Sequence, residues 1–572
     1  MSIRLFLPLL AAGCLKAPAQ TGPPTPPALV CGEMADGSHT FGVLHLNDVY
    51  RIEGLLDGRG GLARVATLRA ELEETCPDLL LTHGGDLLSP SLLSKSTNDE
   101  DPDNKRKVRF YGAHMVDILS RLDGDPSAFD PHMFVAIGNH EFDQSDAGFA
   151  PTLDRLFEAS GFTWLDTGLA WTDGAVAADN LVDTHVVNIA GVDVGLFGVT
   201  IDKPKMPYVT TDPDYVSVAT AAIAALEAQE PDVILGITHL DISDDLALLE
   251  AIPEHPHLIL GGHNHTAMTR TSSDGRLVLK GDADAARVRI AYVTVDKDGG
   301  VSVRTDVVGD DGTPLDPTTP KHPAVQGAVE GWLSALDALF CGVDQLGCLG
   351  EELTVTNTTL VAEELKIRRY ETNLGDWLLD EALAVFADHE PDLAFMNSGS
   401  LRLNQDIAAG TPIPRQVVEE LFPYSSPLHL IEVKGADILG VAARSVEAWE
   451  GNGHWLQVGG WGFHHDPDAE DPAQRATKVS LLPAGGDAVA IDPDKVYRVV
   501  VNDYLISDRY DRDGYTFDFT KIDTPEDGTD LKQVVTGLLR DAGDAGISLA
   551  VDGRICNAQE AAKADPPPCR IP

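Results

Sequence analysis

Side chains that can bind metal ions follow a series of apolar segments in this 572-residue chain. Each segment is typical of a buried strand, and a carboxylate, an amide or an imidazole comes within a few positions of its end. Ligands bind outside the carboxyl ends of strands in open α/β sheets, so we expect these groups to meet at one place. In chain order the strand ends read D at Asp48, G-G-D ending at Asp86, G-N-H-E-x-D from Gly138, T-H ending at His239 and G-G-H-x-H ending at His265.

The donor types define the chemistry that such a site can perform. Two divalent cations about 3.5–4 Å apart can hold an attacking water and a phosphoryl oxygen. The repulsion between the cations calls for an anionic bridge, and Asp86 is well placed to supply it. Imidazole, carboxylate and carbonyl oxygen together suit zinc, manganese or iron better than calcium. The sequence therefore predicts two divalent metal ions, with zinc or manganese preferred.

A hexapeptide, G-N-H-E-F-D from Gly138 to Asp143, carries the densest set of polar groups. It follows the apolar run from Met133 to Ile137. Alone, it could equally be a polar turn whose Asn and Asp bond their own backbone. The other strand ends of the same kind favour a catalytic interpretation.

Residues 40–300 resemble the calcineurin-like metallophosphoesterases, and specifically the 5'-nucleotidase family, on the motifs N-D, G-G-D, G-N-H-E-x-D, T-H and G-G-H-x-H in that order. The resemblance implies that His140 and Asp143 form a catalytic dyad. His140 would stabilise charge on the phosphoryl group or protonate the leaving oxygen, and Asp143 would fix its tautomer. The implied ligands of one metal are Asp48, Asp86 and His265, and those of the other are Asp86, Asn139, His239 and His263.

The first motif departs from the family pattern. The family usually has D-x-H, whereas this chain has Asp48-Val49-Tyr50, which makes it an N-D-V-Y variant that some family members share. A phenol with a pKa of about 10 is a poor ligand unless a metal lowers that value. The first metal is therefore expected to have three protein ligands plus water, or to differ in identity.

The second half of the chain resembles the C-terminal nucleotide-binding domain of the same family. Its string N-S-G-S-L-R stands where the family has N-G-G-G-I-R. By this resemblance, Tyr424 and Tyr515 would stack on the two faces of a base. Arg368 and Arg402 would contact phosphate or sugar, with Asn397 beside them. Without the resemblance, each tyrosine would be an ordinary core aromatic and Arg368 a surface salt bridge.

Apolar periodicity predicts the elements that position these groups. Strands are expected from His39 to the Asn47-Asp48 pair, before Asp86, and at 133–137, 192–199, 233–239 and from 258. Helices are expected at 62–74 and 324–340, with a further one ending at about 387. The resemblance implies an N-terminal four-layer α/β/β/α metallophosphoesterase domain plus a C-terminal α/β nucleotide-binding domain.

Composition and resemblance together give the expected domain boundaries. They are a signal peptide at 1–13, a Pro-rich tether at 14–38, the metallophosphoesterase domain at 39–320, a linker helix at 321–355 and the C-terminal 5'-nucleotidase substrate-binding domain at 356–572. In the family the C-terminal domain is thought to rotate between open and closed states, so turnover would depend on a hinge near residue 350.

The amino terminus and the cysteines predict export. A basic start, a short apolar region and the string L-A-A-G-C resemble a bacterial lipoprotein signal that would leave Cys14 lipid-bearing and attached to a membrane. A plain signal peptide is the alternative. Six cysteines remain, and their pairing is open because six allow fifteen connectivities. We expect a periplasmic or outer-surface location with a lipid anchor.

The net charge of −48 argues against a nucleic-acid polymer as partner, because such partners need a basic surface. The leading hypothesis is an exported dinuclear-metal phosphohydrolase acting on nucleoside 5'-monophosphates or related nucleotides. Alternatives of the same fold are a UDP-sugar hydrolase, a 2',3'-cyclic nucleotide phosphodiesterase and a sulfur-ester hydrolase. A non-catalytic nucleotide-binding lipoprotein is a further alternative.

Overall fold

The computed structural model describes residues 30–572 except 96–109, 145, 173, 204–205, 306–311, 342–346, 448–451, 509–511, 564–565 and 567. The expected signal peptide at 1–13 and the expected lipid-bearing Cys14 lie outside the described residues.

Two β-sheets stack face to face in the first half of the chain, which we define as residues 30–349. One has the order β16-β15-β2-β3-β4-β5-β7 and the other the order β13-β14-β12-β11-β9-β8. Apolar side chains from both sheets, among them Val43, Leu80, Leu235 and Leu260, form the core between them. The strands of the first sheet are β2 (His39–Leu46), β3 (Leu80–His83), β4 (Met133–Ala136), β5 (Thr163–Leu165), β7 (Leu181–Val182), β15 (Arg287–Val295) and β16 (Val301–Thr305). Those of the second are β8 (Thr184–Ile189), β9 (Val192–Phe197), β11 (Val233–Thr238), β12 (Leu258–Gly261), β13 (Met268–Thr271) and β14 (Leu277–Lys280).

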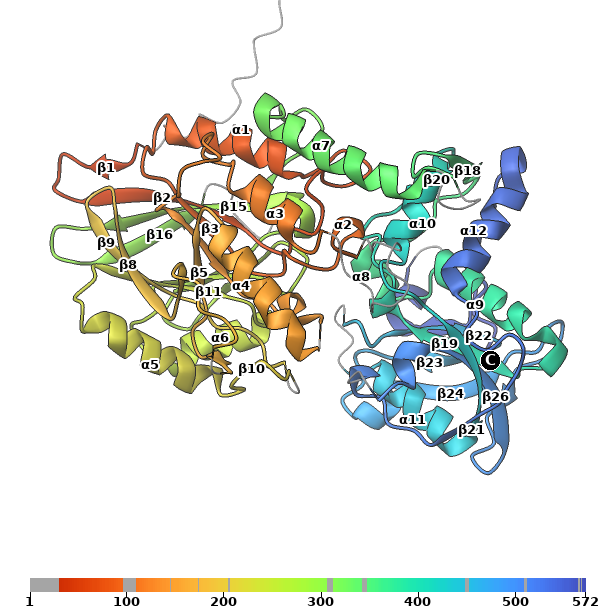
Figure 1. The fold of residues 1–572 in the computed structure, drawn as a ribbon. Helices are drawn as coiled ribbons and strands as arrows, with labels where there is room; N and C mark the ends of the chain where they lie inside the picture. Colours follow the sequence, from red (N-terminus) through yellow and green to blue (C-terminus); the bar gives the residue numbers. More distant parts are fainter. Residues whose placement is uncertain are drawn as a thin grey trace, which may run out of the picture.

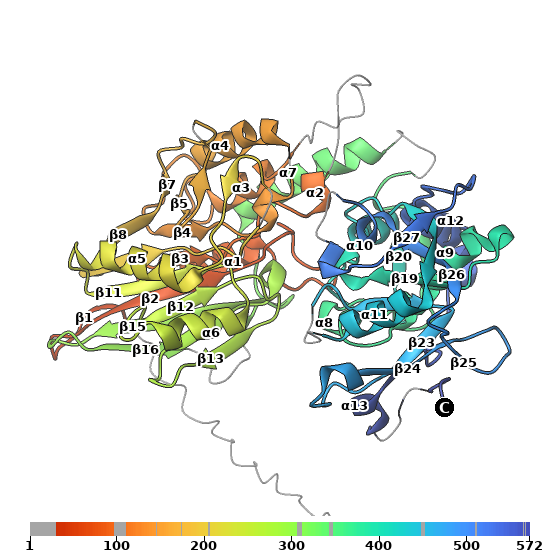
Figure 2. The ribbon, with the colours of Figure 1, turned by 90° about the horizontal axis from the view of Figure 1, so that it is seen from below.

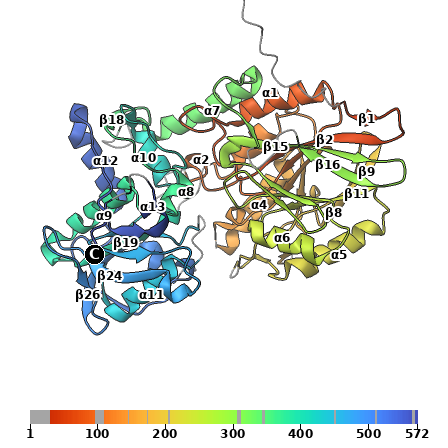
Figure 3. The same ribbon diagram turned by 180° about the vertical axis from the view of Figure 1, so that it is seen from behind.

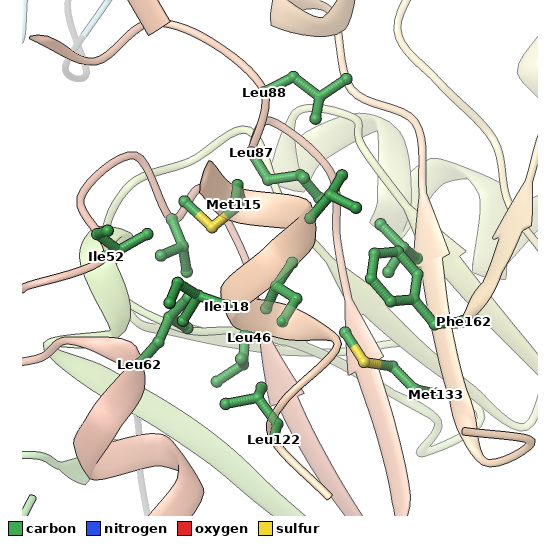
Figure 4. Close-up of a cluster of buried hydrophobic side chains, with 14 of the residues drawn as sticks. Leu46, Ile52, Leu62, Leu87, Leu88, Met115, Ile118, Leu122, Met133 and Phe162 are labelled. Atoms are coloured by element: carbon green, nitrogen blue, oxygen red, sulfur yellow. The ribbon is translucent and has the colours of Figure 1, made fainter. Parts of the chain in front are cut away.

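Helices cover the outer face of each sheet (Figures 1 and 3). Those over the first sheet are α1 (Leu62–Glu73), α3 (Ala113–Leu119), α4 (Ala150–Ala159) and α7 (Pro323–Phe340), and those over the second are α5 (Tyr215–Glu227) and α6 (Ile242–Ala251). Figure 4 shows the first of these interfaces, where Leu62, Met115 and Ile118 from the helices pack with Leu46 and Met133 from the strands. This arrangement confirms the predicted α/β/β/α layering.

Helix α5 illustrates how the sequence specifies these layers. The side chain of Asp214 accepts a hydrogen bond from the backbone N–H of Ser217 and so caps the first turn. Ala219, Ala222 and Leu226 are buried at helical spacing against the sheet. Burying a leucine of this kind contributes about 1.5–3 kcal/mol, so packing rather than propensity holds the helix in place.

The second half, residues 350–572, is built on a mixed sheet of order β22-β19-β26-β21-β27, with a smaller sheet of order β25-β24-β23-β28 beside it. The main sheet contains β19 (Leu393–Asn397), β21 (Leu428–Lys434), β22 (Leu456–Gly459), β26 (Val496–Asn502) and β27 (Phe519–Lys521). The smaller sheet contains β23 (Trp461–His465), β24 (Ala476–Leu481), β25 (Val489–Ala490) and β28 (Ile555–Asn557). The helices are α8 (Glu364–Ile367), α9 (Asn373–Val385), α10 (Arg415–Leu421), α11 (Gly435–Ser445), α12 (Leu531–Ala542) and α13 (Ala558–Ala561). Separate apolar clusters on the two faces of the main sheet confirm the expected α/β class.

The connection between the halves runs along α7, which contacts α1 and α3 and extends toward β20 (Pro412–Pro414) in Figure 1. The short helix α8 lies at the junction of the two halves in Figures 1 and 2. The cysteines pair as Cys31–Cys76, Cys341–Cys348 and Cys556–Cys569, which settles the connectivity that the sequence left open. Within the described part of the chain, no helix has the length and apolar composition needed to cross a bilayer. The domain boundaries stay a prediction.

Candidate metal centre and catalytic dyad

The carboxyl ends of strands from both sheets lie at one edge of the first half. In the first sheet Leu46 at the end of β2 pairs with His83 at the end of β3, and His83 pairs with Val135 of β4. In the second sheet Thr238 at the end of β11 pairs with Gly261 at the end of β12. The loops that follow these strands carry all six predicted metal ligands, so the register of the strands brings them together.

The loops after the strands adopt unusual backbone conformations. Asp48, Asp86 and His263 have φ values of 51°, 58° and 72°, in the left-handed region that non-glycine residues rarely adopt. The loops also approach closely, since a Cβ at Gly138 would lie 2.2 Å from Asp86 Oδ1. Strained backbone of this kind persists only where the surrounding structure enforces it, and it clusters at functional sites.

The first group of donors surrounds the hydroxyl of Tyr50. This oxygen lies 3.4 Å from Asp48 Oδ1, 3.2 Å from Asp86 Oδ2 and 2.9 Å from His265 Nε2. The two carboxylates are 0% and 1% exposed, and one hydroxyl proton cannot satisfy all the acceptors around it. Metal–ligand bonds of about 2.1 Å separate neighbouring ligands by about 3.0–3.4 Å, so the spacing fits four donors around one cation.

The second group of donors lies against Asp86. Asn139 Oδ1 is 3.1 Å from His239 Nε2 and 3.2 Å from His263 Nδ1, and Asp86 Oδ2 is 3.1 Å from the same His239 nitrogen. The Nδ1–H of His239 donates to the carbonyl of Gly84 at 2.6 Å, so Nε2 is the ring nitrogen that faces the site and could bind a metal. Asp86 therefore faces both groups, as a bridging carboxylate must.

The pKa values in the cluster show that its buried carboxylates need positive charge nearby. Burial disfavours a charged His239, but the carboxylate of Asp86 outweighs it and raises the pKa of that imidazole to about 9. Burial likewise opposes ionisation of Asp86, yet His239 and His140 hold its pKa far below the ordinary range. Without a cation, the buried carboxylates are thus neutralised by protonated imidazoles. A donor set of carboxylates, imidazoles and an amide oxygen fits divalent metal ions.

The predicted dyad stands beside this cluster. His140 Nδ1 lies 2.9 Å from Asp143 Oδ1, and His140 Nε2 lies 4.0 Å from Asp86 Oδ2. The backbone N–H of His140 also donates to Asp86 Oδ1 at 2.7 Å. The reactive nitrogen of His140 therefore faces the same space as the metal-type donors.

Asp143 is held by residues that sequence reasoning missed. Its Oδ2 accepts from the Ser89 hydroxyl at 2.6 Å and from Lys95 Nζ at 3.1 Å. The hydroxyl of Tyr424, from the second half, donates to the same oxygen at 3.2 Å. Neither Ser89 nor Lys95 lies in a motif, so only the fold reveals them.

Glu141 is a second residue whose role was missed, although it lies within the hexapeptide. It is fully buried, and its carboxylate accepts the backbone N–H groups of Asp86, Leu87, Leu88 and Gly138. It thereby fixes the loop that presents Asp86 to the site. The signal available in the sequence was its position between a metal ligand and the dyad aspartate.

Comparison with known proteins shows similarity to 5'-nucleotidases. Residues 353–517 match the model of the 5'-nucleotidase C-terminal domain. The chain is 22% identical to the 5'-nucleotidase of Bos taurus over 81% of this chain and 82% of that protein. Its fold is similar to that of a 5'-nucleotidase precursor from Thermus thermophilus, with a TM-score of 0.72, 22% identity and coverage of 91% of this chain and 99% of that one.

Residues 353–517 thus carry a 5'-nucleotidase C-terminal domain. Together with the curated relatives, this domain supports a metal-dependent phosphoric ester hydrolase, and the fold implies divalent metal ions. A match at 23% identity to the trifunctional nucleotide phosphoesterase of Bacillus subtilis covers 91% of this chain, which spans only 35% of that longer protein.

The family's substrate residues in the second half are partly assembled. Arg402 lies at the junction, where Tyr424 and Glu364 outweigh burial and raise the pKa of its guanidinium. Its Nε donates to the carbonyl of Gly399 at 2.8 Å. Asn397 donates to Asp513 Oδ2 at 2.8 Å. Tyr424 thus contacts the dyad, Arg402 lines a pocket with Tyr50, and Asn397 is bonded within the second half.

Two predicted substrate residues, Tyr515 and Arg368, have partners within the second half. Tyr515 is 2% exposed within the apolar core, and its hydroxyl donates to the carbonyl of His454 at 2.5 Å. Its ring is enclosed by that core, so the two-sided base clamp with Tyr424 is not formed in this arrangement. Arg368 forms an ion pair with Glu364 at 2.5 Å. Sequence spacing could not show that Tyr515 packs in the apolar core or that Arg368 pairs with the buried carboxylate of Glu364.

Proposed function

We propose that this protein is a phosphomonoesterase that releases phosphate from nucleoside 5'-monophosphates with the aid of two divalent metal ions, zinc or manganese. One observation carries the proposal. The second half brings the Tyr424 hydroxyl to Asp143 of the dyad, and Arg402 lines a pocket together with Tyr50 of the buried donor cluster around Asp86. A substrate bound by the second half would therefore have its phosphate at the donors of the first half.

The metal ions would supply water activation and neutralisation of phosphoryl charge. Asp48, Asp86, His265 and the Tyr50 hydroxyl would hold one of them. The other would be held by Asp86, Asn139, His239 and His263.

His140 would act on the leaving oxygen. Its Nδ1–H donates to Asp143, which fixes the ring so that Nε2 faces the reacting phosphate. A proton held at Nε2 would pass to the departing ribose oxygen or stabilise charge on the phosphoryl group. Ser89 and Lys95 keep Asp143 in place, so the dyad is ordered before substrate arrives.

The second half would supply the contacts to the nucleotide. The guanidinium of Arg402 suits a phosphate or a sugar oxygen. The ring of Tyr424, which Lys95 Nζ approaches at 4.6 Å from its centroid, would contact the base. Arg368, Asn397 and Tyr515 are proposed to join these contacts when substrate is bound or when the halves change their arrangement.

We place the protein outside the cytoplasm, in the periplasm or on the outer surface and anchored through Cys14. Three disulfides support an oxidising compartment, because such bonds are rare where thiols are kept reduced. The proposed division of the chain is the one given by sequence, with a metallophosphoesterase domain at 39–320, a linker helix at 321–355 and a substrate-binding domain at 356–572.

Phosphate release from AMP in the presence of Mn²⁺ or Zn²⁺ tests the function. We expect turnover by the wild-type protein and a loss of about 10²–10⁴-fold in His140→Ala, because general acid–base groups contribute that much. Bound metal should be unchanged in the variant, since His140 is not a ligand. Glycerol phosphate, UDP-glucose and 2',3'-cyclic AMP serve as comparison substrates. Absence of phosphate release from AMP by the metal-loaded wild type would refute the proposal.

A further inference from the structure

The carboxylate of Glu364, from the second half, contacts His265, a predicted metal ligand of the first half. Glu364 Oε2, at the start of α8, lies 2.5 Å from His265 Nδ1. Glu364 is 5% exposed, and its other oxygen forms the ion pair with Arg368 at 2.5 Å. The junction where α8 meets the first half is visible in Figures 1 and 2.

The contact determines which nitrogen of His265 is available. With Nδ1–H donated to Glu364, the lone pair stands on Nε2. That nitrogen lies 2.9 Å from the Tyr50 hydroxyl and 3.4 Å from Asp48 Oδ1, within the first group of donors. A carboxylate behind a metal-binding imidazole fixes the ring and strengthens it as a ligand.

The source of this carboxylate is unusual. His239, in the second group, is oriented by the carbonyl of Gly84 from the same half. His265 is instead oriented by a residue that follows α7 and the Cys341–Cys348 turn in sequence. The orientation of His265 in the first group therefore depends on the arrangement of the two halves seen here, whereas His239 in the second group is oriented within the first half alone.

We propose that Glu364 is a positioning residue that couples the arrangement of the two halves to the affinity of the first metal site. The inference rests on the proposed dinuclear function. Binding of the first cation would favour the arrangement in which Glu364 meets His265, and that arrangement would favour the cation by the same factor. The second cation, held by Asn139, His239 and His263 with Asp86, would bind independently of it.

Equilibrium Mn²⁺ titration of the full chain, after removal of bound metal with a chelator, tests this coupling. Glu364→Ala should weaken one of two sites by about 10–100-fold, as loss of an outer carboxylate does, and leave the other unchanged. Glu364→Gln should recover part of the affinity, because its amide oxygen can still accept from Nδ1–H. Recovery of this kind would not follow from a merely structural role.

Gln405→Ala is the matched control. Gln405 Oε1 accepts from the backbone N–H of Leu56, so this variant also removes a hydrogen bond between the halves but touches no metal-type residue. It should leave the ratio of the two affinities within about twofold. X-ray scattering in solution gives the second readout, because Mn²⁺ should reduce the radius of gyration of the wild type more than that of Glu364→Ala.

The outcomes separate the two proposals. If the wild type binds two Mn²⁺ ions and hydrolyses AMP but Glu364→Ala binds both ions equally well, the coupling is refuted and the function stands. The coupling is also refuted if Glu364→Ala weakens both sites equally. If the wild type binds no Mn²⁺ and releases no phosphate, the proposed function fails and the coupling falls with it.

Discussion

At the scale of single residues, the candidate site depends on the hydrogen bonds that orient each metal-binding side chain. Glu141 accepts four backbone N–H groups and fixes the loop of Asp86. The carbonyl of Gly84 fixes the tautomer of His239. Tyr50 differs, because its hydroxyl contacts groups within the site itself. Burial and the carboxylates of Asp86 and Asp48 raise the pKa of the Tyr50 phenol well above its ordinary value. The phenol therefore keeps its proton unless a bound cation displaces it.

Replacing Tyr50 with Phe therefore tests its place among the ligands. The variant removes an oxygen spaced as a ligand and should weaken one Mn²⁺ site by about tenfold or more, as judged by equilibrium titration. Tyr111→Phe is the control, since its buried hydroxyl contacts the backbone carbonyls of His140 and Glu141. Equal Mn²⁺ affinity in Tyr50→Phe and the wild type would remove Tyr50 from the donor set.

At the scale of elements, helices and strands are joined by buried charges outside the site as well. Glu371, which precedes α9, accepts the backbone N–H groups of Gly553 and Ile555. Asp376 in the first turn of α9 accepts from the backbone of Asp552 at 3.1 Å and lies 3.6 Å from Arg554. Burial and the nearby carboxylate of Glu371 raise the pKa of Asp376 to about 9. The segment that leads into β28 is thus tied to α9 through these two carboxylates, which share a proton with each other.

This shared proton predicts a pH dependence of stability. The pKa of Asp376 is about 9 when folded and about 3.9 when unfolded, so folding takes up a proton between these values. Stability should therefore fall as pH rises from about 4 to about 9, by at most about 1.4 kcal/mol per pH unit. Asp376→Asn should flatten the dependence of the urea midpoint between pH 6 and pH 9.

Asp380→Asn is the control for that comparison, because Asp380 bonds the same Arg554 at 2.6 Å but its side chain is 54% exposed. It should leave the slope of the midpoint against pH unchanged. Parallel profiles for Asp376→Asn and the wild type would show that the proton is not held there.

At the scale of the whole molecule, polar contacts between the halves converge near the site. The guanidinium of Arg51 donates to the carbonyls of Arg402 and Leu403 and lies 3.4 Å from Glu420. Tyr424 meets Asp143 and Glu364 meets His265 in the same region. Because these contacts are polar, the arrangement of the halves can be altered without exposing an apolar core.

Arg51→Ala should therefore favour a more extended molecule. Loss of two hydrogen bonds and an ion pair would increase the radius of gyration measured by solution scattering and raise KM for AMP. Arg59→Ala is the control, because Arg59 pairs with Asp57 in its own loop at 2.7 Å and its side chain is partly exposed. Unchanged scattering by Arg51→Ala would show that this contact does not hold the halves together.

The sequence by itself determined the order of strands and helices and the residue types at the strand ends. Apolar runs and motif spacing gave β2, β11 and α7 close to their observed bounds, because burial periodicity is local information. The motifs also identified the His140–Asp143 pair, since the two residues lie three positions apart and one turn brings them together.

Only the tertiary structure decided which distant residues complete the site. Ser89, Lys95 and Glu364 carry no motif, and they reach the dyad or His265 through loops and through the arrangement of the two halves. Tyr515 matches a family position but is buried in the core, because its fit among apolar neighbours decides its exposure. Contacts between residues 48 to 99 positions apart in the sequence depend on packing, which sequence spacing does not encode.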